Sequence, residues 1–272
     1  MAYLPLKKRE KMIQSINHLI EAISSDLKKW APEAKPWFRG ESGDGRSLCP
    51  KIANYKLTEE NYLLQSFRRQ AGGLANVPPR DHTDMWLFLA QHYGVPTRLL
   101  DWTEGALHAL YFVINREKPN PRLYMLNPRE LNTLAGSKTF TPNYPLSWTG
   151  GGGLYVALAW QNRTLDPGQI IEAKKIGLRL DIPLAFPATY QDTRMIAQRS
   201  CFTIHGERLE PLQDILVRRK IDTEKCFFEY KIDPKSRKAI LRELSILGVS
   251  AATLFPDLDH LAEDLLKEMK GY

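Results

Sequence analysis

The 272-residue sequence has few cysteines and no long hydrophobic run. Its longest apolar stretch, Ala106–Ile114, is interrupted by a histidine, whereas a membrane-spanning helix needs about 20 apolar residues. Residues 1–11 carry their charges after the few apolar side chains, so we expect no secretion signal. The three cysteines stand far apart without a CxxC pair, which predicts neither a zinc site nor a disulfide framework. These absences favour a cytoplasmic protein.

Most common catalytic signatures are also missing. The sequence has no GxxxxGK[ST], no strand-linked GxGxxG, no HExxH and no GxSxG. This excludes many standard nucleotide-binding enzymes and metalloproteases. The six histidines show no ligand-like pairing, so no metal site is predicted.

The charge is moderately basic, with 38 Lys and Arg against 31 Asp and Glu, a formal charge of +7 and a pI near 9.2. Nucleic-acid binding usually needs basic residues gathered on one surface, because affinity scales with the number of phosphates neutralised together. Here the basic residues are scattered among apolar ones. The charge therefore permits a nucleic acid or nucleotide as partner without requiring one.

The pattern of apolar residues predicts an α+β fold. Helices are expected at 8–30, 58–74, 81–93, 104–115, 128–135, 154–161, 191–198, 235–247 and 258–269. Strands are expected at 37–40, 122–126, 170–173, 178–182, 201–205, 226–232 and 249–254, with a break at 183–187. Helices thus dominate the first half and strands the second. We expect a single compact domain at 36–272, with small, mainly antiparallel sheets flanked by helices, and an N-terminal helical extension at 1–35.

The first group of candidate site residues is Trp37-Phe38-Arg39-Gly40-Glu41. An arginine at the end of an aromatic strand, beside a glycine that allows close backbone approach, can grip a diphosphate or carboxylate with two parallel hydrogen bonds. The alternative is a structural arginine that pairs with Asp101 or Glu41.

The second group lies at 91–102 and includes His92, Tyr93, Thr97, Arg98, Asp101 and Trp102. It combines amide, imidazole, phenol, hydroxyl, guanidinium, carboxylate and indole groups, which is the hydrogen-bonding variety that a nucleotide or nucleobase pocket needs. The alternative is a buried ion pair between Arg98 and Asp101 that holds a turn, since a buried charge must be compensated.

The third group is Arg194, Gln198 and His205. Arg194 and Gln198 are four residues apart and share one helix face, and His205 closes the strand that follows. A helix cap with a solvated face explains them equally well. The glycine run at 150–153 could present backbone N–H groups to a phosphate, but without a following Lys-Ser/Thr pair it is better read as a turn or lid.

Several of these segments together resemble the FRG domain family. They are the segments at 37–41, 91–103, 194–198 and 253–259. The family takes its name from a Phe-Arg-Gly triplet, here Phe38-Arg39-Gly40. The resemblance covers nearly the whole chain after the first helix, and the 91–103 segment is its most specific part.

A weaker resemblance is to ADP-ribosyltransferases. That family places an arginine, often followed by glycine, at the end of an early strand to hold the diphosphate of NAD, and a carboxylate late in the fold. Arg39 and Gly40 match the first position. Residues 194–198 are similar to the late motif of DNA-modifying toxins of that family, but Gln198 replaces the glutamate. Because an amide cannot activate a nucleophile as a carboxylate does, another acid would be needed, such as Glu41, Glu207 or Glu229.

The two resemblances imply an enzyme that uses NAD as a substrate to modify a nucleic-acid or protein target, as a toxin or an antiphage defence effector. The alternative is a nucleotide or nucleic-acid binding module without catalysis. The implied catalytic residues are Gln198, Glu41, His92 and Tyr93. The implied cofactor-binding residues are Arg39, Gly40, Thr97, Arg98, Asp101, Trp102, Arg194 and His205. Neither a metal nor a membrane partner is expected.

Overall fold

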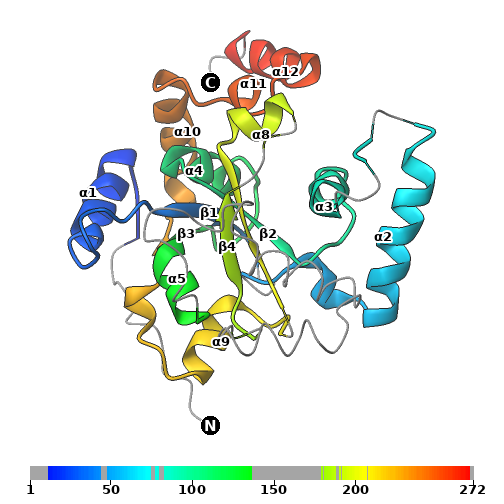
Figure 1. The fold of residues 1–272 in the computed structure, drawn as a ribbon. Helices are drawn as coiled ribbons and strands as arrows, with labels where there is room; N and C mark the ends of the chain where they lie inside the picture. The colour runs from blue at the N-terminus through cyan, green and yellow to red at the C-terminus, as the bar shows by residue number, and fades with distance from the viewer. Residues whose placement is uncertain are drawn as a thin grey trace.

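The computed structural model describes residues 12–43, 48–74, 77–79, 83–136, 179, 181–187, 190, 192–206 and 208–269. Within this part of the chain, a six-stranded sheet with the order β4-β5-β2-β1-β3-β6 forms the centre of the molecule (Figure 1). All neighbouring strands are antiparallel. The strands are β1 (Trp37–Glu41), β2 (Leu99–Thr103), β3 (Arg122–Leu126), β4 (Leu184–Pro187), β5 (Ser200–Ile204) and β6 (Phe227–Lys231). The predicted α+β fold is confirmed.

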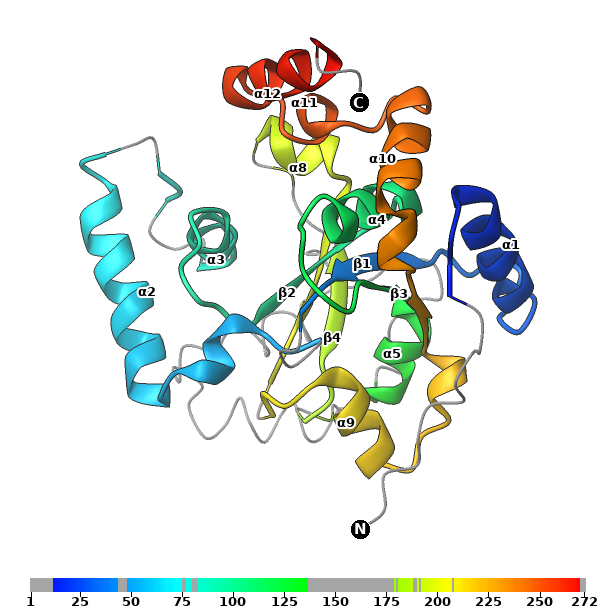
Figure 2. The same ribbon diagram turned by 180° about the vertical axis from the view of Figure 1, so that it is seen from behind.

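Helices cover both faces of this sheet (Figures 1 and 2). Those with residues in one core are α1 (Ile16–Leu27), α4 (Ala106–Ile114), α10 (Arg237–Ile246) and α11 (Ala251–Leu254). Those with residues in the other are α2 (Leu57–Ala71), α3 (Thr83–His92), α5 (Pro128–Leu134), α8 (Thr193–Ala197) and α9 (Leu212–Arg218). Short 3-10 helices are η1 (Lys51–Asn54), η3 (Thr223–Lys225) and η4 (Pro234–Ser236), and α12 (Leu258–Met269) is the last helix described.

The two cores arise from the alternation of side chains along each strand. Trp37 and Phe227 belong to the core with α3 and α5, whereas their neighbours Phe38 and Phe228 belong to the core with α1 and α4. Both faces of the central strands are therefore buried. This explains why β1 and β6 carry consecutive aromatic residues rather than a clean alternation of apolar and polar ones.

The first helix, α1, is packed into the core that contains α4 and α10. Leu19 on α1 is fully buried, and Ile13, just before α1, forms a parallel bridge with Ile232 after β6. At the end of α1, the buried carboxylate of Asp26 accepts a hydrogen bond of 2.9 Å from the Tyr230 hydroxyl. The segment predicted as an extension thus contributes to the hydrophobic core, although the domain boundary after residue 35 stays a prediction.

Four expectations about local structure are wrong. Residues 249–254 contain the helix α11 rather than a strand, because Ser250 and Thr253 form a capping box at its start. The segment 183–187, expected as a break, contains β4, whose position at the edge of the sheet tolerates the terminal Pro187. The strand β2 and the helix α9 were not expected. Within the described residues, strands also do not concentrate in the second half, since β1, β2 and β3 all end by residue 126.

Other expectations cannot be compared with the structure. The helix at 154–161, the strand at 170–173 and the glycine run at 150–153 lie outside the described residues. The expected strand at 178–182 can be compared in part, and there it is wrong, because none of the described residues 179, 181 and 182 is in a strand.

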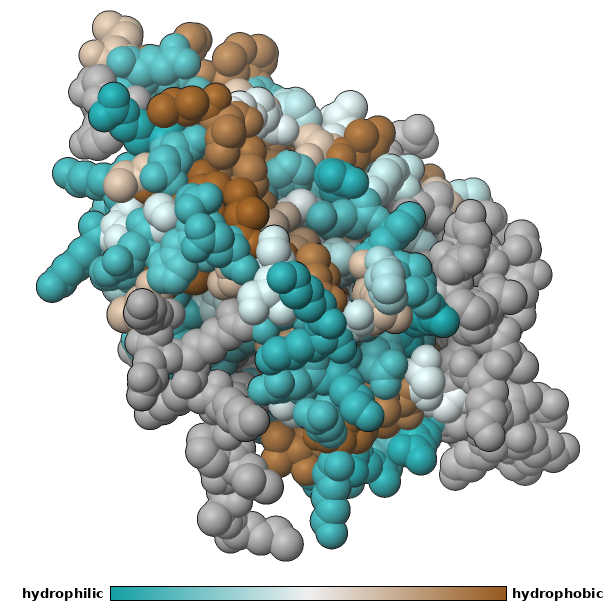
Figure 3. Space-filling view, turned by 90° about the vertical axis from the view of Figure 1, so that its left-hand side faces the viewer, coloured by the Kyte–Doolittle hydropathy of each residue, from teal (hydrophilic) through white to brown (hydrophobic). Residues whose placement is uncertain are grey.

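The C-terminal helix α12 is amphipathic and has no buried residue. It is tied to α11 by Asp264, whose carboxylate accepts hydrogen bonds from the backbone N–H groups of Ala251 and Ala252. Its apolar side chains and those at the end of α10 are exposed, namely Ile246, Leu247, Leu258, Leu261, Leu265, Leu266 and Met269. Apolar surface is visible in the upper part of Figure 3, the height at which Figure 1 places α10 to α12. Among the described helices, none is both long and apolar enough to cross a membrane.

Gly40 allows α4 to pack directly on β1. A Cβ atom at position 40 would lie 2.1 Å from the carbonyl oxygen of Ala109 and 2.9 Å from the Cβ of Val113. Both contacts are far below van der Waals distance, and the first is with backbone, which cannot move aside as a side chain can. The predicted close approach at this glycine is real, and the element that approaches is the helix α4.

We therefore expect Gly40→Ala to destabilise the fold by about 1–3 kcal/mol, because α4 must move away from the sheet. Gly72→Ala is the matched control, since a Cβ there meets only Val77 Cγ2 at 4.0 Å. The midpoints of thermal and urea unfolding measure both effects. Equal stability of the two variants would contradict the close packing of α4 on β1.

Candidate functional site

Arg39 lies where the pairing of β1 with β2 ends. β1 pairs with β3 through all five of its residues, but the register pair with β2 is at Phe38 and Thr103. One residue further, the Arg39 guanidinium donates through Nη1 to the main-chain oxygen of Asp101 at 2.6 Å. The side chain thereby joins the two strands where their backbones do not.

Glu41 holds this guanidinium in place. Its Oε1 accepts from Arg39 Nε at 2.5 Å, and its Oε2 accepts from the backbone N–H of Leu48 at 3.0 Å. Both carboxylate oxygens are therefore engaged, and the Glu41 side chain is only 16 % exposed. The structure thus favours Glu41 as a positioning residue for Arg39 over its predicted catalytic role.

The carboxylate of Asp101 faces solvent beside Arg39. Its Oδ2 lies 3.7 Å from Arg39 Nη1, and the side chain is 55 % exposed. The amide of Gln91 donates to both carboxylate oxygens, at 3.1 and 3.0 Å, and accepts from the Thr97 hydroxyl at 2.7 Å. Both ion pairs that the structural alternative supposed for Arg39, with Glu41 and with Asp101, are therefore present. We call Arg39, Glu41, Asp101 and Gln91 the Arg39 network.

The Arg39 network keeps its cation charged. Burial lowers the pKa of Arg39, but the carboxylates of Glu41 and Asp101 outweigh this effect, so that the pKa is raised above its ordinary value. The Arg39 side chain retains 21 % exposure, and among the described residues no bond to its Nη2 is found. A permanent cation with an available donor, next to an exposed carboxylate, is suited to binding a ligand that carries both an anionic group and hydroxyl groups.

Arg98 pairs with Glu60, and not with Asp101 as the structural alternative supposed. Its guanidinium makes two bonds to the Glu60 carboxylate, at 2.6 and 2.7 Å, and a third to the main-chain oxygen of Gly206. Arg98 and Glu60 are about 4 % exposed. Arg98 therefore anchors α2 to the start of β2 and has no surface for a cofactor.

Four other candidate binding residues are also buried or packed against other parts of the protein. Trp102 donates through Nε1 to the Thr203 hydroxyl at 3.0 Å, and both side chains are buried. Thr97 is buried between Gln91 and the backbone N–H of Leu99. His205 is fully buried next to Arg98, and Gly40 is covered by α4. These residues are buried or packed within the fold, and their predicted binding roles stay predictions.

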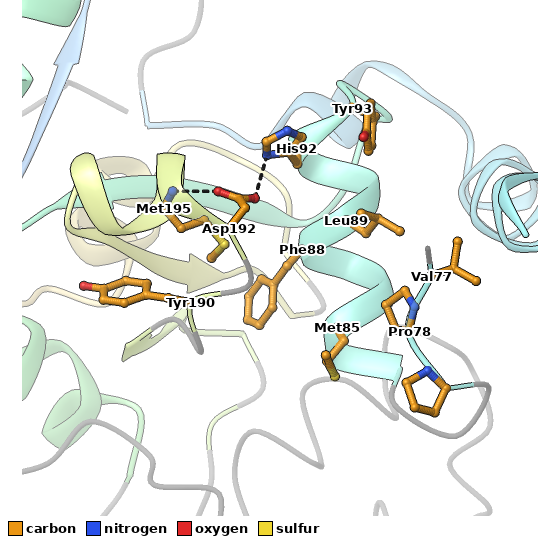
Figure 4. A pocket seen from close by; sticks show the side chains of 11 residues that line it. Val77, Pro78, Met85, Phe88, Leu89, His92, Tyr93, Tyr190, Asp192 and Met195 are labelled. Carbon is orange, nitrogen blue, oxygen red and sulfur yellow. Dashed lines mark hydrogen bonds and ion pairs between the residues drawn. The ribbon is translucent and has the colours of Figure 1, made fainter. Parts of the chain in front are cut away.

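His92 and Tyr93, at the end of α3, line a cavity of about 400 Å³ (Figure 4). His92 Nδ1 lies 3.2 Å from Asp192 Oδ2, which joins the second candidate segment to the third. Tyr93 is 63 % exposed, with its ring 5.0 Å from that of His92. Both residues remain accessible candidates.

Arg194 and Gln198 are directed to α11 and not to the Arg39 network. The Arg194 guanidinium lies over the Phe255 ring at 4.7 Å, and Gln198 Nε2 donates to the main-chain oxygen of Leu254 at 3.1 Å. The carbonyl of Gln198 accepts from Thr103. Of the other acids considered, Glu229 pairs with Arg122 at 3.5 Å, and Glu207 lies outside the described residues.

The roles of Glu60, Gln91 and Asp192 were not predicted from the sequence. Asp192 precedes Thr193 at the start of α8, and its carboxylate accepts from the Met195 N–H, so an N-cap signal could have located it. Gln91 belongs to the polar segment already singled out. Glu60 offers no such signal, because its partner is 38 residues away. Among the described residues, no group of three or more His, Cys, Asp or Glu could hold a metal ion.

The buried His205 makes stability depend on pH. Burial lowers its pKa to about 3, and the positive charge of Arg98 acts in the same direction. Since the unfolded state takes up this proton near pH 6.5, the stabilisation is complete above that pH and is lost as pH falls toward 3. Between pH 6.5 and 3, each unit by which the pH falls raises the unfolding equilibrium constant by up to about tenfold through His205.

His205→Gln should flatten the pH dependence of stability between pH 6.5 and 3, because the uncharged amide takes up no proton. Urea titrations of both proteins at several pH values measure it. An unchanged slope would mean that His205 is charged in the folded protein.

Comparison with protein families adds one finding. Residues 34–122 match the model of the FRG domain family. The match contains the Phe38-Arg39-Gly40 triplet and the whole 91–103 segment, whereas the segments 194–198 and 253–259 lie beyond it. No curated protein and no solved structure matched the chain. The predicted FRG domain is confirmed over residues 34–122, and the resemblance of the later segments stays a prediction.

Proposed function

We propose that this protein is an ADP-ribosyltransferase-like enzyme that binds NAD at the Arg39 network. The observation that carries the proposal is the exposed Asp101 carboxylate beside the Arg39 cation, at the end of the paired part of β1. The guanidinium, fixed by Glu41, offers to the diphosphate of NAD its Nη2 donor, for which the described part of the chain provides no partner. The early-strand arginine followed by glycine is the feature that the chain has in common with that enzyme class.

Asp101 is the acid that fits this chemistry. Transfer requires cleavage of the bond between the nicotinamide nitrogen and the ribose carbon, and a carboxylate that orients the ribose hydroxyls or accepts the proton of the attacking nucleophile. The Gln198 amide donates to the Leu254 carbonyl, and the Glu41 carboxylate, only 16 % exposed, accepts from Arg39 and Leu48. Asp101 combines exposure with fixed orientation, because Gln91 holds both of its oxygens.

The substrate that receives the ADP-ribose is a nucleic acid or a protein, as the moderate positive charge permits. A role as a toxin or an antiphage defence effector belongs to the same proposal.

A binding module without catalysis is the second candidate, and the position of Gln198 favours it. The late residue that aligns with the transferase glutamate is an amide, and its side chain serves to hold α11. In this reading the Arg39 network holds a nucleotide or the backbone of a nucleic acid, and no bond is broken.

Arg39→Lys should reduce the affinity for NAD and ADP-ribose by about tenfold or more, because an ammonium group cannot make parallel bonds to two phosphate oxygens while contacting Glu41. Arg129→Lys is the matched control, since Arg129 pairs with Glu33 at the surface of α5. Titration calorimetry measures affinity, and thermal unfolding checks the fold. Unchanged affinity in Arg39→Lys would refute the proposed binding site, and a large fall in melting temperature would indicate a structural role alone.

Asp101→Asn should lower the release of nicotinamide from NAD by about 100-fold or more with little change in NAD affinity, because the amide is isosteric but cannot act as a base. Glu41→Gln is the contrasting variant and should weaken binding by loosening Arg39. The assay follows nicotinamide release with DNA, RNA or cell lysate as acceptor. NAD binding without any release by the unaltered protein would support the binding module, and full activity of Asp101→Asn would place the acid elsewhere.

A further inference from the structure

The cavity at the end of α3 has the form of a small-molecule site. Its volume of about 400 Å³ falls within the range of roughly 300–1,000 Å³ typical of ligand pockets. One wall is α3, and the opposite wall is formed by Tyr190, Asp192 and Met195, the last of which lies in α8 (Figure 4). We call it the α3–α8 pocket.

The walls of the α3–α8 pocket are mostly apolar and aromatic. The lining includes Pro78, Met85, Phe88, Leu89, Tyr190 and Met195. Phe88 is fixed from behind, because its ring stacks on Phe202 at 5.0 Å and packs against Phe186 at 6.0 Å. A flat apolar surface held in this way favours a planar ring and disfavours a free anion, which would lose its hydration without gaining a cation.

His92 gives this pocket a directed polar group. Its Nδ1 faces Asp192 Oδ2 at 3.2 Å, and the other oxygen of Asp192 accepts from the Met195 N–H at 2.8 Å. In the neutral imidazole the carboxylate favours the proton on Nδ1, and Nε2 is then a hydrogen-bond acceptor. A ligand ring that carries an N–H donor, such as an amino or carboxamide group, complements this atom.

The α3–α8 pocket and the Arg39 network flank the same turn of α3. Gln91 contacts Asp101, and the next residue, His92, lines the pocket. The two sites thus adjoin at the C-terminal end of α3.

We propose that the α3–α8 pocket binds the planar nitrogen heterocycle of a nucleotide whose phosphate groups lie at Arg39. The ring carries an exocyclic N–H donor to His92 Nε2, as both the amino group of adenine and the carboxamide of nicotinamide can. This proposal rests on the proposed nucleotide site but does not require that any bond be cleaved.

The test is titration of the full chain with adenosine, nicotinamide, ribose 5-phosphate and NAD. Val77→Trp fills the pocket from its rim, and Ile196→Trp places the same indole on an exposed position of α8 outside the lining. We expect Val77→Trp to weaken the binding of adenosine or nicotinamide by more than tenfold and to leave ribose 5-phosphate unchanged. Ile196→Trp should bind all four probes as the unaltered protein does.

A second comparison tests the polar contact. Adenosine should bind more tightly than purine riboside, which lacks the amino group, and His92→Phe should abolish that preference while retaining a ring in the pocket. Preference for nicotinamide over benzene would identify the carboxamide ring instead. The proposal would be overturned if neither adenosine nor nicotinamide bound, or if both bound Val77→Trp with the affinity of the unaltered protein. If the pocket binds the ring but no nicotinamide is released, the pocket proposal holds and the transferase proposal is refuted. If nicotinamide is released and Val77→Trp does not change that release, the transferase proposal holds and the pocket proposal is refuted.

Discussion

The guanidinium of Arg39 is the connection on which the arrangement of the site depends. A cation at the point where β1 and β2 separate must be compensated, and Glu41 and the Asp101 carbonyl provide this. Glu41 in turn fixes the loop at Leu48, and the Asp101 side chain fixes the end of α3 through Gln91. Since the end of α3 forms one wall of the α3–α8 pocket, the position of that wall is linked to Arg39 by a chain of hydrogen bonds.

The Phe-Arg-Gly triplet follows from the two faces of β1. Phe38 and Gly40 face α4, where the first fills the core and the second admits the helix backbone. Arg39 points to the opposite face, so its charge avoids the packed layer under α4. Phe38 thus packs in the core, Arg39 joins β1 to β2, and Gly40 lets α4 pack on the strand. Of the three, only Arg39 offers a polar side-chain group to a ligand.

The sequence predicted the fold best where the apolar pattern is local. The helices α3, α4 and α5 and the strands β3 and β6 lie close to their expected positions, because each follows one periodicity and ends at a glycine, proline or cap. β2 was not predicted because the buried polar residue Thr103 and the exposed Asp101 interrupt the run of apolar residues that would indicate a buried strand. At the site, proximity of Arg39 to Asp101 could be predicted from their chemistry. The pairing of Arg98 with Glu60 could not, because only the packing of α2 brings them together.

The most specific segment of the chain, 91–103, combines scaffold and site. Its buried polar groups are paired within the protein, Arg98 with Glu60 and Trp102 with Thr203, and such pairs fix the positions of α2 and β5 relative to β2. The accessible side chains include Gln91, His92 and Tyr93 at the end of α3 and Asp101 on β2. A rigid scaffold that leaves an amide, an imidazole and a carboxylate facing one region is the arrangement that ligand binding requires. The variety of residue types in this segment therefore has two causes, and only the accessible groups bear on function.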